Sequence, residues 1–200
     1  MLLNNIPKQE IIYIIGGGTS LKEVNLSLIE DKFVIGINNA FSLGGWIDVC
    51  WFGDRHWYEW NKDRLEGYNG ILSTCHPEFR EDKSMLYLER RKWMGIETEF
   101  PFVAWNRCSG GSAINLAYHL GVKKIVLIAF DMERNSEGQN NWHNEHKVKI
   151  DFDTYNPYPG FLRAFRQIAV EAKQLDLEIL DTSLNGRLNC FPKIKLEDCI

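Results

Sequence analysis

A short run of β-branched residues that ends in three consecutive glycines most constrains the fold of this chain. Ile11–Ile15 is apolar at every position, and the glycines at 16–18 follow it directly. This composition is typical of a strand that is buried on both faces, and such strands occur in parallel sheets covered by helices. The glycines would let the backbone turn tightly and approach a ligand closely at the carboxyl end of the strand.

The same alternation of buried strand and polar connection recurs along the chain. We expect further strands over 33–37, 47–52, 71–74, 123–130 and 177–180. We expect helices that begin after Asp54, at Ser109 and at Phe161, and Gly121 should end the second of them. The pattern predicts an α/β protein, with residues 1–200 forming a single Rossmann-like domain whose mostly parallel sheet carries helices on both faces. Ligands of such sheets bind beyond the carboxyl ends of the strands.

Composition narrows the function classes. The 200 residues are 44% hydrophobic and 25% charged, as in an ordinary globular domain, and the net charge of −4 gives no basic field for non-specific nucleic-acid binding. None of the five cysteines forms a C-x-x-C pair, so we expect reduced thiols and a cytoplasmic protein. The first ten residues lack the pattern of a secretory signal, and no apolar run is long enough to cross a bilayer.

Polar residues after the first two predicted strands suit a phosphorylated ligand. Backbone N–H groups of the glycines at 16–18, with the hydroxyls of Thr19 and Ser20, can bind phosphate. Leu21 replaces the last glycine of G-x-G-x-x-G, and the P-loop lysine is missing, which disfavours a dinucleotide dehydrogenase and a P-loop NTPase. The amides at 38–39 can both donate and accept. The alternative is that these residues only form turns.

Two predicted helix starts are further candidates. Asp54 follows the third strand and could contact a ligand or only cap the helix that contains Trp57 and Trp60. For the two tryptophans we favour core packing over stacking on a sugar or base. Ser109 and Gly110 open a later helix, whose N-terminal N–H groups would attract an anion, unless the segment is only a capped helix with packing glycines.

A long polar segment follows the strongest predicted strand, over 131–158. Long loops in compact domains are usually functional or disordered, and histidine is the natural general base near neutral pH. His143 and His146 are also spaced to share a metal, but no third ligand is evident. The D-x-D at 151–153 looks like that of metal-dependent sugar transferases but stands far from the first strands. We therefore predict no metal site.

Several of these motifs resemble those of one known family in order and approximate spacing. The segment 16–21 resembles the G-N-G-P-S-L of bacterial lipooligosaccharide sialyltransferases, and also a wider Rossmann-like family that includes archaeal 6-hydroxymethylpterin diphosphokinase. Asn-Asn-Ala-Phe at 38–41 is similar to the sialyltransferase N-Q-F element. The stretch 108–131 is similar to their T-S-G…A-L-G-Y-K-E-I…I-D. The chain departs from the motifs at Gly17, Thr19 and Glu133, and it is shorter.

The resemblance implies a metal-independent, inverting glycosyltransferase that uses a nucleotide sugar, CMP-linked, and a hydroxyl acceptor, with no other cofactor. In that family a histidine after the I-D strand deprotonates the acceptor, and tyrosines hydrogen-bond the leaving phosphate. Carried over, the catalytic candidates are His146, His143, Tyr155 and Tyr158. The candidates for nucleotide binding are Gly16, Gly17, Gly18, Thr19, Ser20, Asn38, Asn39, Asp54, Ser109, Gly110 and Asp131.

Two alternatives belong to other functional classes. A Mg²⁺-dependent diphosphokinase of the hydroxymethylpterin type would move pyrophosphate from ATP to a small alcohol, with Asp54 and Asp131 as the candidate carboxylates. A non-catalytic nucleotide-binding or assembly protein would keep the fold without the chemistry. The sequence does not identify the sugar, the acceptor or the oligomeric state.

Overall fold

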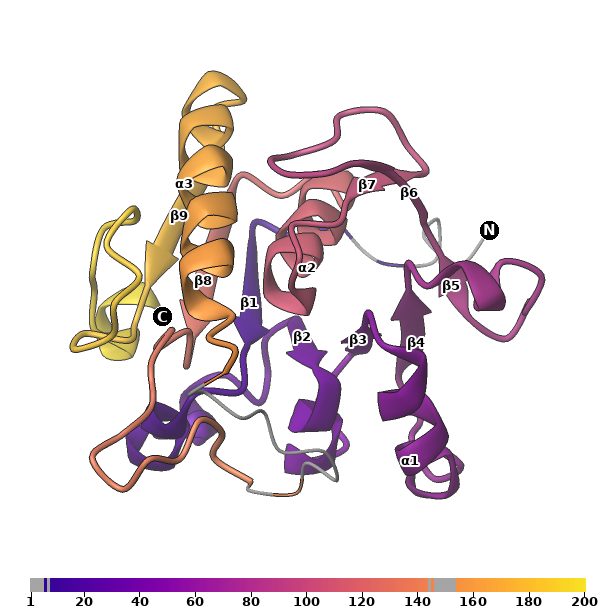
Figure 1. The fold of residues 1–200 in the computed structure, drawn as a ribbon, viewed down its shortest axis with the longest axis horizontal. Helices are drawn as coiled ribbons and strands as arrows, with labels where there is room; N and C mark the ends of the chain where they lie inside the picture. The colour runs from indigo at the N-terminus through magenta and orange to yellow at the C-terminus, as the bar shows by residue number, and fades with distance from the viewer. Residues whose placement is uncertain (1–5, 7, 144, 146–153) are drawn as a thin grey trace.

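A parallel sheet forms the centre of the protein (Figure 1). The computed structural model describes residues 6, 8–143, 145 and 154–200. Within them the sheet has seven strands in the order β5-β4-β3-β2-β1-β8-β9, and every neighbouring pair is parallel. The strands are β1 (Ile11–Ile15), β2 (Val34–Ile37), β3 (Val49–Phe52), β4 (Ile71–Thr74), β5 (Leu86–Tyr87), β8 (Lys124–Ile128) and β9 (Glu178–Asp181). The α/β fold predicted from the sequence is confirmed.

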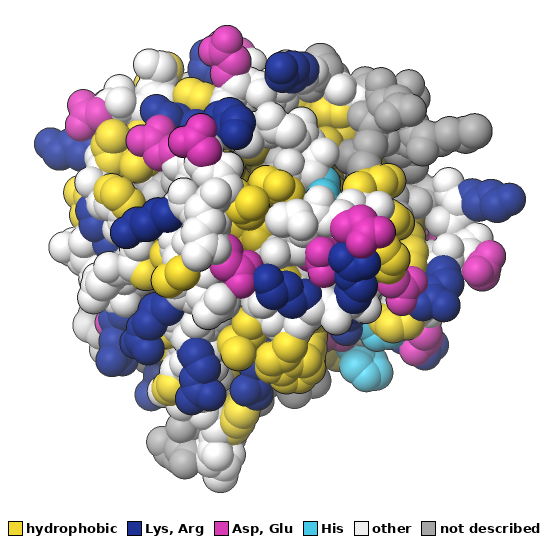
Figure 2. Space-filling model, turned by 90° about the horizontal axis from the view of Figure 1, so that it is seen from above, with side chains coloured by type: hydrophobic (Ala, Val, Ile, Leu, Met, Phe, Trp, Pro, Cys, Tyr) yellow, Lys and Arg dark blue, Asp and Glu magenta, His cyan; other side chains and the backbone are white. Residues whose placement is uncertain are grey.

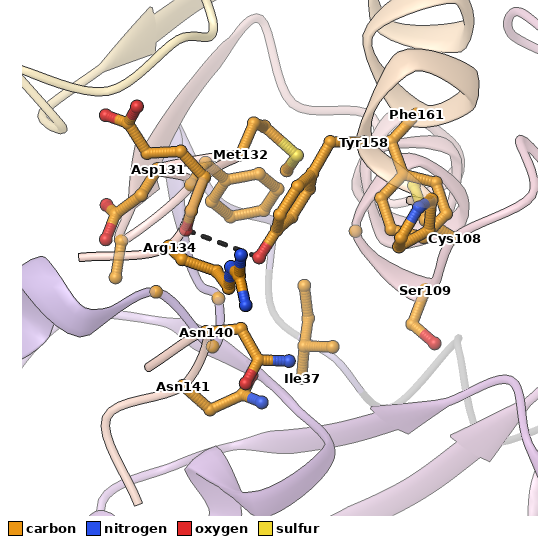
Figure 3. Close-up of a pocket in the computed structure, with 18 of the residues that line it drawn as sticks. Ile37, Cys108, Ser109, Asp131, Met132, Arg134, Asn140, Asn141, Tyr158 and Phe161 are labelled. Atoms are coloured by element: carbon orange, nitrogen blue, oxygen red, sulfur yellow. Dashed lines mark hydrogen bonds between the residues drawn. The ribbon is translucent and has the colours of Figure 1, made fainter. Parts of the chain in front are cut away.

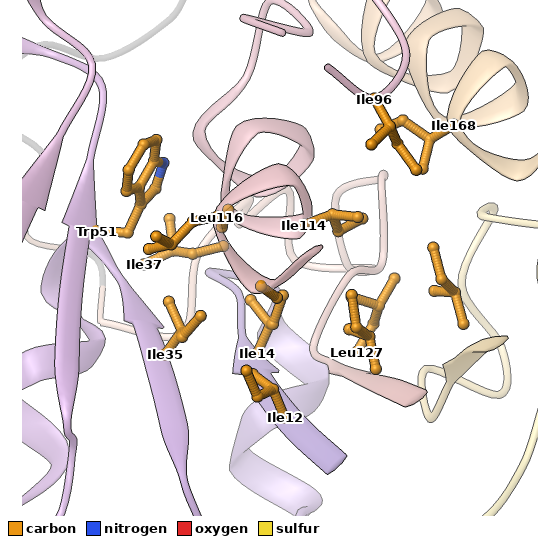
Figure 4. Close-up of a cluster of buried hydrophobic side chains, with 14 of the residues drawn as sticks. Ile12, Ile14, Ile35, Ile37, Trp51, Ile96, Ile114, Leu116, Leu127 and Ile168 are labelled. Atoms are coloured by element: carbon orange, nitrogen blue, oxygen red, sulfur yellow. The ribbon is translucent and has the colours of Figure 1, made fainter. Parts of the chain in front are cut away.

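One face of the sheet is covered by two α-helices, α2 (Ser109–His119) and α3 (Tyr158–Gln174). Alternate strand residues such as Ile12 and Ile14 point to this face, where they pack with Ile114 and other buried apolar side chains (Figure 4). The strands β1, β2, β3 and β8 are buried at nearly every position, as the continuous apolar runs predict.

The opposite face carries α1 (Arg55–Leu65) and mostly short 3₁₀ helices rather than long α-helices. Among the described residues, the 3₁₀ helices are η2 (Thr19–Glu23), η3 (Leu26–Leu28), η4 (Asn38–Leu43), η5 (Pro77–Phe79) and η6 (Leu196–Cys199). Trp57 is buried in the cluster under α1, so it packs in the core as expected. Within the described residues, none of the helices has the length and apolar character needed to span a membrane.

Local capping explains where the helices begin and end. The Asp54 carboxylate accepts a hydrogen bond from the His56 N–H (2.8 Å) and caps α1. The Cys108 sulfur accepts one from the Gly111 N–H (3.3 Å) at the start of α2. Gly121, just beyond the C-terminus of α2, has a φ of +80°, which glycine adopts without strain.

A small second sheet, which the sequence did not predict, lies against α2. It pairs β6 (Glu89–Lys92) with β7 (Phe102–Ala104) in parallel. Charged residues dominate β6, so it lacks the apolar pattern of a strand. The buried Asn115 side chain of α2 holds it in place: its oxygen accepts from the N–H groups of Glu97 (2.7 Å) and Ala104 (2.9 Å).

The order of the strands creates one crevice at the carboxyl edge of the sheet. From β1 the chain passes to β2, β3, β4 and β5 on one side, and the later strands β8 and β9 lie on the other. The loops after β1 and β8 therefore diverge, and a crevice opens between them. Elsewhere the surface mixes charges: acidic and basic side chains are interspersed over the face seen in Figure 2.

Candidate functional site

A cavity of about 640 Å³ occupies the crevice between the ends of β1 and β8. The glycines after β1, the end of β2, the start of α2, the segment 129–141 after β8 and the start of α3 all contribute to its wall. Figure 3 shows Arg134, Asn140 and Asn141 on one side of the view and Ser109 on the other. Of the residues predicted from the sequence, the lining contains Gly16, Gly17, Gly18, Asn38, Asp54, Ser109, Gly110, Asp131 and Tyr158.

The turn after β1 is held by Asp131 of the opposite loop. The Asp131 carboxylate accepts hydrogen bonds from the Ser20 N–H (2.9 Å), the Ser20 hydroxyl (2.5 Å) and the Thr19 hydroxyl (3.4 Å). In addition, the Gly18 N–H donates to the Ala129 carbonyl (2.9 Å). The two hydroxyls that we expected to bind phosphate therefore bind a carboxylate in this structure, and Thr19 and Ser20 line a second, adjoining cavity of about 570 Å³.

The glycines permit close packing of the turn against the β8 loop. A Cβ on Gly18 would lie 2.6 Å from the Asp131 carboxyl carbon and 2.7 Å from the Ala129 carbonyl oxygen. The backbone of Gly18, with φ −63° and ψ 153°, is open to any residue. The requirement for glycine at this position is therefore steric, and it arises from the loop after β8 rather than from the turn itself.

The two adjacent asparagines after β2 have different roles. Asn38 lines the cavity with a φ of +52°, and its side-chain oxygen is buried with no hydrogen-bond partner among the described residues. Asn39 is only 4% exposed: its oxygen accepts from the Trp57 indole N–H (2.6 Å), and its amide donates to Glu145 (2.9 Å). A buried acceptor without a donor is costly, so Asn38 is the amide that a ligand would satisfy.

The N-terminus of α2 faces the cavity with Ser109 and Gly110. Cys108 caps this helix, and burial raises the pKa of its thiol to about 12 although the capping N–H groups oppose this shift, so the sulfur stays neutral near pH 7. The N–H groups of the first helical turn and the helix dipole make this end attractive to an anion. Arg107, directly before the cap, also lines the cavity and has a φ of +59°.

Asp54 and Tyr158 line the cavity, but the other candidate tyrosine, Tyr155, does not. Asp54 borders the cavity while it caps α1, so the structural and the binding interpretations of this residue are compatible. Tyr158 opens α3, lines the cavity and donates its hydroxyl to the Glu133 carbonyl (3.3 Å). Burial raises its pKa to about 12, so the hydroxyl remains a donor at neutral pH. Tyr155 is 55% exposed and is not among the lining residues.

Of the two candidate histidines, the structure describes only His143. His143 Nδ1 accepts a hydrogen bond from the Glu145 N–H (3.0 Å), and its ring meets the Trp142 ring edge-on. His143 is not among the residues that line the cavity. His146 and the D-x-D at 151–153 lie outside the described residues. Within the described part of the chain, no group of three or more His, Cys, Asp or Glu side chains is placed to hold a metal ion.

Sequence reasoning missed several lining residues, among them Arg107, Arg134, Asn140 and Asn141. Arg134, Asn140 and Asn141 lie in the long polar segment that the sequence analysis singled out, but only its histidines, tyrosines and Asp131 were named as candidates. Arg107 stands immediately before a predicted anion-binding helix start, and a cation at that position could have identified it as a candidate anion-binding residue.

Comparisons with known proteins show the fold. No family model and no curated protein matches the chain. Two solved structures of the sialyltransferase CstII from Campylobacter jejuni are similar. The complex with cytidine-5'-monophosphate is 15% identical with a TM-score of 0.57, over 94% of this chain and 86% of that one. The complex with CMP-3FNeuAc is 14% identical with a TM-score of 0.58, over 93% and 86%. The chain shares the fold of these sialyltransferase structures.

Proposed function

We propose that residues 1–200 form one nucleotide-binding domain that transfers a sugar from a CMP-linked donor to a hydroxyl acceptor, as an inverting sialyltransferase-like enzyme. The observation that carries the proposal is the pairing, in one cavity, of an anion-attracting helix N-terminus with Asn38 Oδ1, a buried acceptor that has no partner in the described part of the chain. A nucleoside monophosphate would offer a hydrogen-bond donor to the Asn38 oxygen and a phosphate anion to the helix N-terminus. That CstII was solved with CMP and a CMP-sugar analogue supports the choice of nucleotide.

Each side of the cavity would have its own part in binding. The phosphate would sit at the start of α2, against the N–H groups of Ser109 and Gly110, with Arg134 supplying positive charge from the opposite loop. The glycine turn would let the donor approach the sheet closely. Asn38 Oδ1 would accept a hydrogen bond from a ribose hydroxyl or from the exocyclic amine of cytosine.

The reaction needs a base and compensation for charge on the leaving group. A histidine would take the proton of the acceptor hydroxyl, and the oxygen would attack the anomeric carbon from the side opposite the phosphate. The bond to CMP breaks as the new glycosidic bond forms. Tyr158 and the α2 N-terminus would stabilise the departing phosphate, with Tyr155 as the other tyrosine candidate for this role. His146 is the base that we propose, with His143 as the other candidate.

Nucleotide binding gives the first test. At ten times its Kd, CMP should stabilise the protein by about 1.4 kcal/mol, a rise in melting temperature of about 3–6 °C, whereas AMP should shift it far less. Asn38→Gly should keep the fold, because glycine adopts a positive φ freely, and should weaken CMP binding about tenfold. A cavity that binds no pyrimidine nucleotide at millimolar concentration would refute the proposal.

Removal of the Tyr158 hydroxyl tests the phosphate contact. Tyr158→Phe keeps the ring beside Phe161 and loses the long hydrogen bond to the Glu133 carbonyl, so stability should change by less than about 1 kcal/mol. Turnover should fall about tenfold or more if the hydroxyl donates to the leaving phosphate. Because the pKa of Tyr158 is raised to about 12, its ionisation should leave no trace in a pH–rate profile below pH 10. Unchanged turnover in the variant would remove Tyr158 from the mechanism.

The diphosphokinase alternative has less support from the geometry. It needs free carboxylates for Mg²⁺, but both oxygens of Asp131 accept hydrogen bonds from the Thr19–Ser20 segment and Asp54 caps a helix. Activity measured with and without EDTA separates the two ideas, since a pyrophosphate transfer from ATP depends on the cation.

A further inference from the structure

Two tryptophans of the small sheet form an aromatic surface that the proposed donor site does not use. Trp93 follows β6, Trp105 follows β7, and their rings meet edge-on with centroids 4.8 Å apart. Trp93 is 56% exposed, and Trp105 is partly exposed. A large indole left open to solvent offers an apolar face that a ligand can cover.

Two arginines connect this surface to the cavity. The Arg107 guanidinium lies over the Trp93 ring at 5.9 Å, and Arg107 itself lines the cavity. Arg90 lies over the Trp105 ring at 5.1 Å and donates to the Gly53 carbonyl (2.8 Å), beside the lining residue Asp54. Among the described residues neither arginine forms an ion pair with a carboxylate, whereas Arg91 of the same strand pairs with Glu97 and Glu99.

Buried polar groups hold the tryptophans in place. The fully buried Asn106 accepts from the Gly95 N–H (2.7 Å) and donates to the Gly95 carbonyl (2.9 Å), which fixes the turn after Trp93. The Asn106 N–H also donates to the Trp93 carbonyl, and the Trp105 N–H to the Lys92 carbonyl, both at 2.9 Å. The exposed rings are therefore carried by a fixed backbone, as a preorganised binding surface requires.

We propose that Trp93, Trp105 and Arg107 bind the acceptor, and that the acceptor is a sugar that carries a carboxylate. The C–H face of a pyranose ring would pack on the Trp93 indole. Its carboxylate would accept hydrogen bonds from the edge of the Arg107 guanidinium, which stacking on the indole leaves free. The identity of this ligand as an acceptor rests on the proposed function, because it places the sugar beside the donor cavity.

The charges favour an acidic sugar over the other occupants of an aromatic surface. A neutral sugar would leave Arg107 without a counter-charge, and a purely apolar partner would bury it unpaired, which is costly. The cytosine base is already accounted for by the cavity that contains Asn38. A second copy of this chain is the remaining alternative, and size-exclusion chromatography of the wild type and of each variant measures the oligomeric state beside the titrations.

The test uses matched sugars and the intact protein. Methyl glucuronide and methyl galacturonide are compared with methyl glucoside and methyl galactoside, with binding followed by NMR titration in the presence and absence of CMP. The acidic sugars should bind about tenfold more tightly than their neutral partners. Arg107→Gln should abolish that preference, Trp93→Ala should weaken the acidic sugars about tenfold or more, and Trp93→Phe should restore most of the affinity. Trp60→Ala, which changes an indole stacked on His56 in α1, is the control and should have no effect.

The outcomes separate this proposal from the donor proposal. If CMP shifts the melting temperature but no sugar binds, or if sugar binding ignores Trp93→Ala, the acceptor surface is wrong and the donor site stands. If Trp93→Ala changes only the oligomeric state, the surface is a contact between copies and the proposal is overturned. A loss of CMP affinity in Arg107→Gln, with the acidic preference intact, assigns Arg107 to the donor and also overturns it. Sugar binding that depends on Trp93 without any CMP binding supports the surface and refutes the donor.

Discussion

Gly18→Ala should lower the melting temperature by about 5–10 °C and remove most CMP binding, although it adds only one methyl group. The new Cβ would meet the Ala129 carbonyl oxygen and the Asp131 carboxyl, neither of which can move without breaking the hydrogen bonds that join the β1 turn to the β8 loop. Thermal unfolding with and without CMP measures both effects in one preparation.

Gly17→Ala is the matched control for this change. Within the part of the chain that the structure describes, a Cβ there would approach only the Asn141 side chain, whose oxygen would lie at 2.9 Å, and that side chain can rotate away. We expect a shift of at most about 2–3 °C. Equal losses in the two variants would show that the turn tolerates no side chain anywhere, and the specific role of the Asp131 contact would then be wrong.

The second large effect concerns the general base. His146→Ala should lower kcat by roughly two to four orders of magnitude and leave CMP affinity nearly unchanged, because in our proposal the Asn38 amide, the glycine turn and the α2 N-terminus bind the nucleotide. His143→Ala should lower kcat only slightly. The His143 Nδ1 already accepts a backbone N–H, so we assign this ring to holding the local loop rather than to accepting the proton of the acceptor hydroxyl. Steady-state kinetics with a CMP-linked donor, together with CMP titration, separate the two steps.

Three results would contradict this assignment. If neither variant slows turnover by about tenfold, the base lies elsewhere. If His143→Ala is the more damaging and CMP affinity is intact, the roles of the two histidines are reversed. Unfolding of both variants, read from the far-ultraviolet circular dichroism, would make the histidines structural.

The central strands were predictable because their composition leaves little choice. Ile11–Ile15 and the apolar part of 123–130 are too rich in β-branched and other apolar residues to lie anywhere but inside a parallel sheet. The first segment is β1, and the second contains β8, which is shorter than predicted and spans Lys124–Ile128. The small sheet was not predictable by this argument, because Glu89–Lys92 is charged and its strand pairing depends on the buried amide of Asn115 in α2. The small sheet forms because of these tertiary contacts, and the periodicity of apolar residues in the sequence contains no information about them.

The same limit applies within the site. Sequence position placed Ser20 beside a ligand, but its hydroxyl binds Asp131, a residue 111 positions away. Asn38 and Asn39 are chemically identical, and only the fold shows that the first faces the cavity while the second binds Trp57 and Glu145. Residue type predicts what a side chain can do; which one does it depends on long-range packing that a linear pattern does not contain.

The pairing of β1 with β8 has a consequence for biosynthesis. Ile11 lies opposite Lys124, and Ile15 lies opposite Ile128. More than half of the chain must therefore be synthesised before the second edge of β1 can be covered. A nascent polypeptide shorter than about 131 residues can pair β1 with β2 but cannot close the cavity between β1 and β8, and it exposes an isoleucine-rich strand edge to other chains. Truncated products of this gene should therefore aggregate rather than act as small nucleotide-binding fragments, and ribosome-bound intermediates should need chaperone protection until β8 emerges.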